Sequence, residues 1–156
     1  MKGNVKIIEA LNDVLTAELT GINQYFVHAK MCDNWGYERL AEAIRKESME
    51  EMKHAEELIE RILFLEGVPN MQRLAKVKVG EKVAEQLKLD RELELEAVTR
   101  LNQAIALATD VGDNGSRELF EDILESEEDH VNWLEAQLEL IQQVGEQNYL
   151  AQQMRK

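Results

Sequence analysis

The decapeptide MEEMKHAEEL, residues 49–58, places Glu51 and His54 three positions apart in a segment with the apolar spacing of a helix. Residues at positions i and i+3 lie on one helical face, one above the other. Both side chains would therefore point in the same direction, toward the apolar stripe of the helix. Charged or polar side chains are unfavourable in an apolar core unless they have a partner there. The stretch predicts a helix that turns one polar pair, Glu51 and His54, toward the core.

The same spacing recurs in LESEEDHVNW, residues 124–133, where His130 follows Glu127 by three positions. Two other helical stripes of apolar residues are each interrupted near the middle by one carboxylate, Glu18 in the first and Glu94 in the second. Each Glu-x-x-His pair begins 33 positions after one of these carboxylates. The two halves of the chain are therefore copies of one ligand-bearing unit.

The composition favours helices throughout. The 156 residues include eight glycines and one proline, and Ala, Glu, Leu, Lys and Gln are abundant, as is typical of long helices. Apolar residues recur at three- and four-residue steps in four long segments, with glycine or proline between them. We therefore predict an all-α chain with helices at residues 5–34, 38–66, 83–111 and 116–144.

The lengths of the connections predict the topology. Short turns at Gly36 and at residues 112–115 make the first helix antiparallel to the second, and the third antiparallel to the fourth. Residues 67–82 can extend over about 50 Å, whereas a helix of about 28 residues is about 42 Å long. This segment can cross the whole bundle, so we expect two helical hairpins joined by a long crossover, the connectivity of ferritin-like four-helix bundles.

The length of the chain suits one domain with a substantial core. We expect residues 1–156 to form a single ferritin-like domain. The tail, residues 146–156, is too short for periodicity to separate a loose end from a helix, and we expect a short C-terminal helix there.

Charge and cysteine content exclude some classes of partner. Eighteen basic and 31 acidic side chains give a formal charge of −13, which would repel a phosphate backbone and attract cations. Cys32 has no second cysteine to pair with, and the N-terminus carries no apolar run of signal-peptide or membrane-spanning length. We expect a cytoplasmic protein that binds neither nucleic acid nor membrane.

Counting along the helices from each hairpin turn places the two single carboxylates and the two Glu-x-x-His pairs at about the same height in the bundle. Four buried carboxylates would repel one another, at several kcal/mol for each uncompensated ion. Two divalent cations would neutralise them, and two imidazoles would complete a ligand set suited to iron or manganese. One such pair alone would be read as solvated surface, but the repeated set matches the ligands of ferritin-like di-iron proteins. The predicted metal ligands are Glu18, Glu51, His54, Glu94, Glu127 and His130.

Several longer stretches resemble bacterioferritins over essentially the whole chain. They are MKGN (1–4), NQYFVHAKM (23–31), NWG (34–36), MEEMKHAEELIERILFLEGVPN (49–70) and LESEEDHVNWLEAQLELI (124–141). Other di-iron bundles fit less well, because rubrerythrins carry a Cys-rich iron module and haem-free ferritins usually have one Glu-x-x-His.

The resemblance implies that the six residues are the ligands of a ferroxidase centre with two irons per subunit, bridged by Glu51 and Glu127. Fe(II) would be oxidised there by dioxygen or hydrogen peroxide, and stored as a ferric mineral inside a shell of 24 subunits. The chemistry implied is redox rather than Lewis-acid hydrolysis.

The resemblance also implies haem b at a two-fold subunit interface, with Met52 of each subunit as axial ligand. Met52 directly follows Glu51, so it should point about 100° away from the metal face, toward the outside of the bundle. A Met that only fills an interface would look the same in the sequence. A bacterioferritin-associated ferredoxin is the implied electron-transfer partner.

The chain departs from some bacterioferritins at an accessory iron site on the inner surface of the shell. Lys46 and Glu50 stand where those proteins carry a His and an Asp. A protonated lysine offers three donors and no lone pair, which puts the accessory site in doubt.

Other polar and aromatic residues keep two interpretations each. Tyr25 and Trp133 suit either support of the metal ligands or simple core packing. Glu47 suits either an iron relay or a solvated helix end, and His28 and Cys32 are assigned to packing or surface. The alternative function is that of a haem-binding assembly or electron-transfer subunit in a mixed shell, with a non-catalytic di-metal site.

Overall fold

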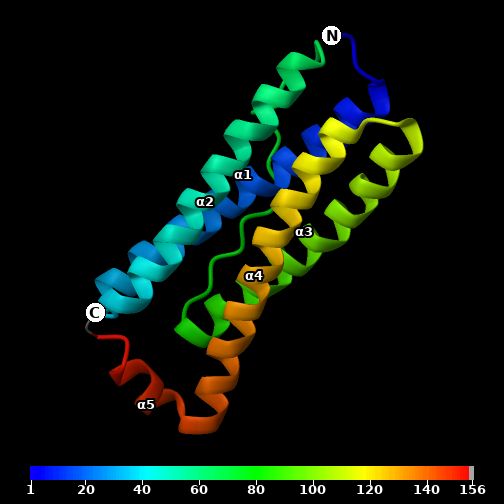
Figure 1. Ribbon diagram of the computed structural model, residues 1–156. Helices are drawn as coiled ribbons and strands as arrows, with labels where there is room; N and C mark the ends of the chain where they lie inside the picture. The colour runs from blue at the N-terminus through cyan, green and yellow to red at the C-terminus, as the bar shows by residue number, and fades with distance from the viewer. Residues whose placement is uncertain (155–156) are drawn as a thin grey trace.

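The computed structural model describes residues 1–154, and within them the chain is helical, without a strand. The helices are α1 (Val5–Asn34), α2 (Glu38–Phe64), α3 (Val83–Val111), α4 (Asn114–Val144) and α5 (Glu146–Ala151). The four long helices lie side by side as a bundle, and α5 turns back at the end where α4 finishes (Figure 1). The predicted all-α, ferritin-like four-helix bundle with a short C-terminal helix is confirmed, while residues 155–156 of the predicted tail lie outside the described residues.

Local capping determines where the helices begin and end. The Asn4 side chain accepts a hydrogen bond from the Lys6 N–H at the start of α1, and the Asp113 side chain accepts one from Ser116 at the start of α4. The Asp113 cap starts α4 at residue 114, so the predicted start at 116 is two residues late. The prediction also extended α2 to residue 66, but α2 ends at Phe64 because Glu66 takes a left-handed conformation with φ of 62°.

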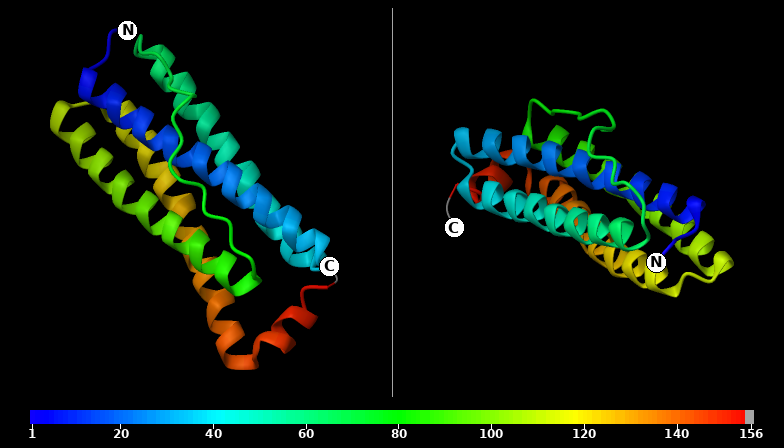
Figure 2. Two further views of the ribbon diagram at one scale, coloured as in Figure 1. Left: turned by 180° about the vertical axis from the view of Figure 1, so that it is seen from behind. Right: turned by 90° about the horizontal axis from the view of Figure 1, so that it is seen from above.

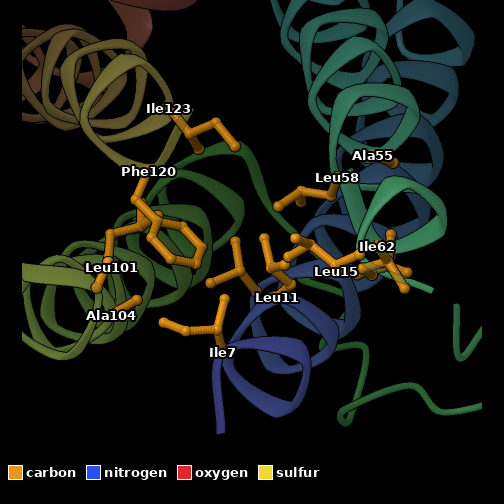
Figure 3. Close-up of a cluster of buried hydrophobic side chains, with 13 residues drawn as sticks. Ile7, Leu11, Leu15, Ala55, Leu58, Ile62, Leu101, Ala104, Phe120 and Ile123 are labelled. Carbon is orange, nitrogen blue, oxygen red and sulfur yellow. The ribbon is translucent and has the colours of Figure 1, made fainter. Parts of the chain in front are cut away.

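Two apolar clusters fill the interior, one toward each end of the bundle. The first, shown in Figure 3, contains Ile7, Leu11, Leu15, Leu58, Ile62, Leu101, Phe120 and Ile123 among others. The second contains Tyr25, Leu40, Ile44, Leu87 and Leu134. The polar residues that interrupt the apolar stripes lie between these clusters, so a rigid core supports them from both sides.

The crossover follows α1 along its length (Figure 2), and a polar stripe with four-residue steps holds it there. Each α1 side chain in this stripe accepts a hydrogen bond from a donor in the crossover. The pairs are Asn12 with the Asn70 N–H (2.7 Å), Thr16 with Arg73 Nε (2.9 Å), Thr20 with the Ala75 N–H (3.0 Å), Gln24 with the Lys78 N–H (3.1 Å) and His28 with the Gly80 N–H (3.0 Å). Residues i and i+4 share a helical face, so side chains on one face of α1 can bind donors from residue 70 to residue 80 of the crossover.

The last residue of this stripe, His28, is buried, and it also contacts α3. His28 Nε2 accepts from the Gly80 N–H, so Nδ1 carries the ring proton and donates to Asp90 Oδ1 at 2.9 Å. Gln24 Nε2 donates to the same oxygen at 2.9 Å. Both donors compensate the buried Asp90 carboxylate, and together they tie the crossover, α1 and α3 into one network.

Replacing His28 with leucine is expected to lower the free energy of unfolding by about 3 kcal/mol, because the Gly80 N–H loses its acceptor and Asp90 loses one donor. Thr16→Val is the control, since Thr16 accepts from the exposed Arg73 and should cost less than about 1 kcal/mol. Urea denaturation at fixed protein concentration measures both. Equal losses of unfolding free energy in the two variants would show that the buried His28 contacts stabilise the fold no more than the exposed Thr16 contact does.

No helix among the described residues carries an apolar stretch long enough to cross a bilayer.

Candidate metal centre

The six side chains singled out by their spacing meet at mid-height in the bundle. α1 contributes Glu18, α2 contributes Glu51 and His54, α3 contributes Glu94, and α4 contributes Glu127 and His130. All six are buried, and none exposes more than the 8% of His54. The structure therefore brings together, in the interior, residues that are 112 positions apart at the extremes of the set.

The ligand atoms fall into two groups that share one carboxylate. In each group, atoms able to bind a metal lie within 4.8 Å of one another. The first group is Glu18, Glu51, His54 and Glu127, and the second is Glu51, Glu94 and His130. Glu51 belongs to both, as a bridging ligand must. Glu127 is grouped only with the first set, although it also lies close to the Glu94 carboxyl group.

In both groups an imidazole faces carboxylate oxygens. In the first, His54 Nδ1 lies 3.5 Å from Glu18 Oε2 and 3.5 Å from Glu127 Oε1. In the second, His130 Nδ1 lies 3.1 Å from Glu94 Oε1. Each imidazole thus turns Nδ1 toward the carboxylates, and one ion placed in each group could reach both oxygen and nitrogen ligands.

The protonation of the carboxylates reflects their crowding. Burial raises the pKa of Glu18 to about 7. Burial, with the neighbouring charges of Glu18 and Glu94, holds the pKa of Glu127 well above its ordinary value. Burial also acts to raise the pKa of Glu94, but its close contacts with Glu127, His130 and the Tyr25 hydroxyl outweigh it and the pKa is lowered. Without cations, the site must retain protons to limit repulsion.

The two imidazoles respond to the same negative charge. Burial acts to lower the pKa of His54, but the negative charge of the nearby Glu18 carboxylate outweighs it and the pKa is raised. Burial opposes the charged form of His130 as well, and Glu94 reverses the balance in the same way, so that its pKa is also raised. The carboxylates therefore favour the protonated form of both histidines. The same carboxylates could instead neutralise bound cations.

Six buried ligand atoms have no partner in hydrogen-bond geometry. They are Glu18 Oε1 and Oε2, Glu51 Oε1, Glu94 Oε2, His54 Nδ1 and His130 Nδ1. Leaving one buried polar atom unsatisfied costs about 1–3 kcal/mol, so such a concentration needs a compensating ligand. The charge, the donor types and their convergence fit two divalent cations.

Gly21 provides room for the shared carboxylate. A Cβ at this position of α1 would lie 3.3 Å from Glu51 Oε2 and 3.3 Å from the Tyr25 ring. A glycine inside a helix costs about 1 kcal/mol relative to alanine, and here it lets the Glu51 side chain approach α1 closely.

Side chains around His130 support the second group. The Tyr25 hydroxyl donates to Glu94 Oε1, and its ring meets His130 edge-on with centroids 5.1 Å apart. Trp133 stacks on His130 at 6.2 Å, and Glu47 Oε2 lies 3.5 Å from His130 Nδ1. Tyr25 and Trp133 therefore contact the candidate ligands Glu94 and His130 as well as packing the core. Glu47 is a further neighbour of His130 that does not belong to the repeated set.

Other residues singled out from the sequence lie outside the centre. Met52 is half exposed on α2, in keeping with the expected turn away from Glu51. Lys46 is exposed and Glu50 is partly buried. Cys32 is buried, and its thiol donates to Gln86 Oε1 at 3.3 Å.

Comparisons with known proteins agree with this architecture. The sequence model of the ferritin-like domain family matches residues 8–144. The chain is 51% identical to a bacterioferritin of Streptomyces coelicolor, over 97% of this chain and 90% of the relative. It is 47% identical to a bacterioferritin of Mycolicibacterium paratuberculosis and 46% identical to one of Mycobacterium avium, in both cases over 97% of this chain and 96% of the relative.

Proposed function

This chain belongs to the bacterioferritins of the ferritin-like family, and from that premise we propose that it oxidises Fe(II) at the six-residue centre and stores the iron as a ferric mineral. The observation that carries the proposal is the convergence of four carboxylates and two imidazoles, with six unpartnered buried ligand atoms, in a bundle of this family. Iron is here both substrate and cargo.

The centre suits a two-electron reaction. Each Fe(II) gives one electron, so two ions together deliver the two electrons that reduce O₂ to H₂O₂, or H₂O₂ to water, with uptake of two protons. Glu18 and His54 would hold one ion, Glu94 and His130 the other, with Glu51 and Glu127 as the proposed bridges. The carboxylates stabilise the ferric product by their charge, and the Tyr25 hydroxyl keeps Glu94 in place.

We further propose that two subunits hold a haem b between them through Met52. The donor fits haem iron: a thioether is a soft ligand, and Met52 is 50% exposed on α2, where a two-fold partner could supply an identical one. Bound haem supplies one-electron transfer, which suits reduction and release of stored iron.

Met52→Leu is expected to abolish haem retention and leave rapid Fe(II) oxidation unchanged, because Met52 lies outside the six-residue centre. Met49→Leu is the matched control, since Met49 is 55% exposed on the same helix. The haem absorbance per chain after reconstitution and desalting measures the effect. Haem retained in Met52→Leu, or lost equally in both variants, would contradict the assignment.

Membership of the bacterioferritins also suggests how the chain is organised and assembled. We propose one ferritin-like domain over residues 1–156, a cytoplasmic shell of 24 such subunits, and a bacterioferritin-associated ferredoxin as reductant. The acidic chain, with a formal charge of −13, suits a container for cations.

Storage is tested by aerobic loading with Fe(II) followed by sedimentation of the assembly. Iron should remain with the protein far beyond two ions per chain, in particles whose protein shell keeps one size. A plateau at two ions per chain would contradict storage, and would favour a haem-binding or electron-transfer subunit of a mixed shell.

A further inference from the structure

Each group of candidate ligands takes side chains from both helical hairpins. α1 and α2 form the first hairpin, and α3 and α4 form the second. The first group adds Glu127 of the second hairpin to three side chains of the first, and the second group adds Glu51 of the first hairpin to two side chains of the second. The reach of these two carboxylates across the centre therefore depends on how one hairpin is aligned along the other.

The hairpins meet more extensively along α1 and α3 than along α2 and α4. Apolar packing is non-directional, so it fixes the alignment of two helices only loosely, and a slip by one helical turn would displace a ligand by about 5.4 Å. Hydrogen bonds are directional, and a buried donor or acceptor that loses its partner is costly. Buried polar contacts between α1 and α3 would therefore select one alignment of the hairpins.

A row of such contacts runs along α1 and α3 beside the centre. In each of them an α1 side chain donates to an α3 side chain, and every member of the row is at most 1% exposed. The pairs are Tyr25 with Glu94, Gln24 and His28 with Asp90, and Cys32 with Gln86. Residue numbers rise along α1 and fall along α3 in steps of about four, as expected for one face of each of two antiparallel helices.

Asp90 has the central place in this row. Its Oδ1 accepts from Gln24 Nε2 and from His28 Nδ1, both at 2.9 Å. Both donors are themselves bound to N–H groups of the crossover, so they are not free to follow a displaced carboxylate. The candidate ligand Glu94 lies one helical turn after Asp90 on the same face of α3. The place of Asp90 along α1 therefore determines the place of Glu94.

We propose that Asp90 is a positioning residue of the metal centre. By binding Gln24 and His28 it fixes the alignment of the two hairpins, and this alignment sets the separation of the two ions and allows carboxylates to bridge them. The inference rests on the proposed function of the centre and deepens it. Because Asp90 acts through the alignment, its loss should disrupt the pairing of two ions more than the binding of one.

The test loads metal-free protein with Mn²⁺, which the ligand set accepts. Electron paramagnetic resonance distinguishes isolated Mn²⁺ from two ions whose spins are coupled through bridging carboxylates, and equilibrium dialysis gives both affinities. The proteins compared are wild type, Asp90→Leu, Asp90→Asn and Leu87→Ala, each checked for folding by circular dichroism. Asparagine keeps an oxygen acceptor in the same shape. Leu87 is buried on the same helix, so its truncation weakens the core without removing a polar contact between the hairpins.

Wild type is expected to bind two Mn²⁺ per chain as a coupled pair. Asp90→Leu should bind the second ion about 10–100-fold more weakly, as is typical when a residue that supports a metal ligand is lost, and should show isolated Mn²⁺. Asp90→Asn should restore the coupled pair, and Leu87→Ala should keep it. A coupled pair of wild-type affinity in Asp90→Leu would overturn the proposal. So would an equal loss in Leu87→Ala or in Asp90→Asn.

Gln24→Leu is the milder variant, because it removes one donor to Asp90 and leaves the other. It should weaken binding of the second ion by about tenfold, the lower end of the same range. If Asp90→Leu does not fold, a pair of wild-type affinity in Gln24→Leu overturns the proposal instead. Glu127→Ala separates this failure from that of the centre. Wild type that binds no more Mn²⁺ than Glu127→Ala would overturn the centre, and the role of Asp90 with it.

Discussion

Replacing Glu127 with alanine is expected to slow the rapid phase of Fe(II) oxidation at least about a hundredfold, because the variant lacks a carboxylate that both holds the substrate and stabilises the ferric product. Glu127 is 1% exposed, and its Oε1 lies 3.5 Å from His54 Nδ1 in the first ligand group. Addition of Fe(II) in air to metal-free protein, followed by ferric absorbance, measures the effect. In the wild type the rapid phase should saturate near two ions per chain.

Glu128→Ala is the control for this variant, since Glu128 is the next residue of α4 and is exposed. It should oxidise Fe(II) at the wild-type rate. A rapid phase of normal amplitude in Glu127→Ala would contradict the proposed catalytic role of the centre. If wild type and Glu127→Ala both oxidised iron only at the rate of the buffer, the six residues would be left with a structural role or a different metal.

Binding of divalent cations is expected to raise the Tm of the metal-free protein by roughly 10 °C or more. Each of two independent sites contributes about 2.7 kcal/mol when the free ion is at a hundred times its Kd, and about 1 kcal/mol shifts the Tm of a chain this size by about 2–4 °C. Mn²⁺ suits the measurement because the ligand set accepts it. Calorimetry with and without Mn²⁺ gives the shift.

This stabilisation should grow as pH rises from about 5 to 8. The folded protein keeps a proton on Glu18 up to its raised pKa of about 7, whereas the unfolded chain loses it near 4.5. The contribution of that proton to stability is therefore complete below about 4.5 and is lost as pH rises through about 7. The raised pKa values of His54 and His130 act with the same sign. Metal ions replace these protons, so an equal or smaller Mn²⁺ effect at pH 8 than at pH 5.5 would contradict this account.

The helices were predictable from the sequence because their apolar residues recur at three- and four-residue steps over many turns. The residues of the centre were predictable because Glu18 and Glu94 break that spacing at positions where a dry core gives a carboxylate no partner. The structure places the six residues together, and their role as iron ligands stays a prediction. The resemblance to bacterioferritins is confirmed by the comparisons.

The features that the sequence did not reveal depend on contacts between distant segments. The polar stripe from Asn12 to His28 has a readable four-residue period, but its partners lie in a crossover without periodicity. The support of Glu94 by Tyr25 spans two helices, so spacing within one helix cannot separate it from ordinary packing. The α2 end at Phe64 was missed because it depends on a single left-handed residue, Glu66.

Anomalous diffraction at the iron edge, from crystals of metal-free protein soaked with Fe(II) without oxygen, tests the centre most directly. Two peaks per chain are predicted inside the bundle, one between Glu18 and His54 and the other between Glu94 and His130, with Glu51 and Glu127 in contact with both. A single interior peak, or iron bound only at the surface of the bundle, would contradict a di-iron centre built from these six residues.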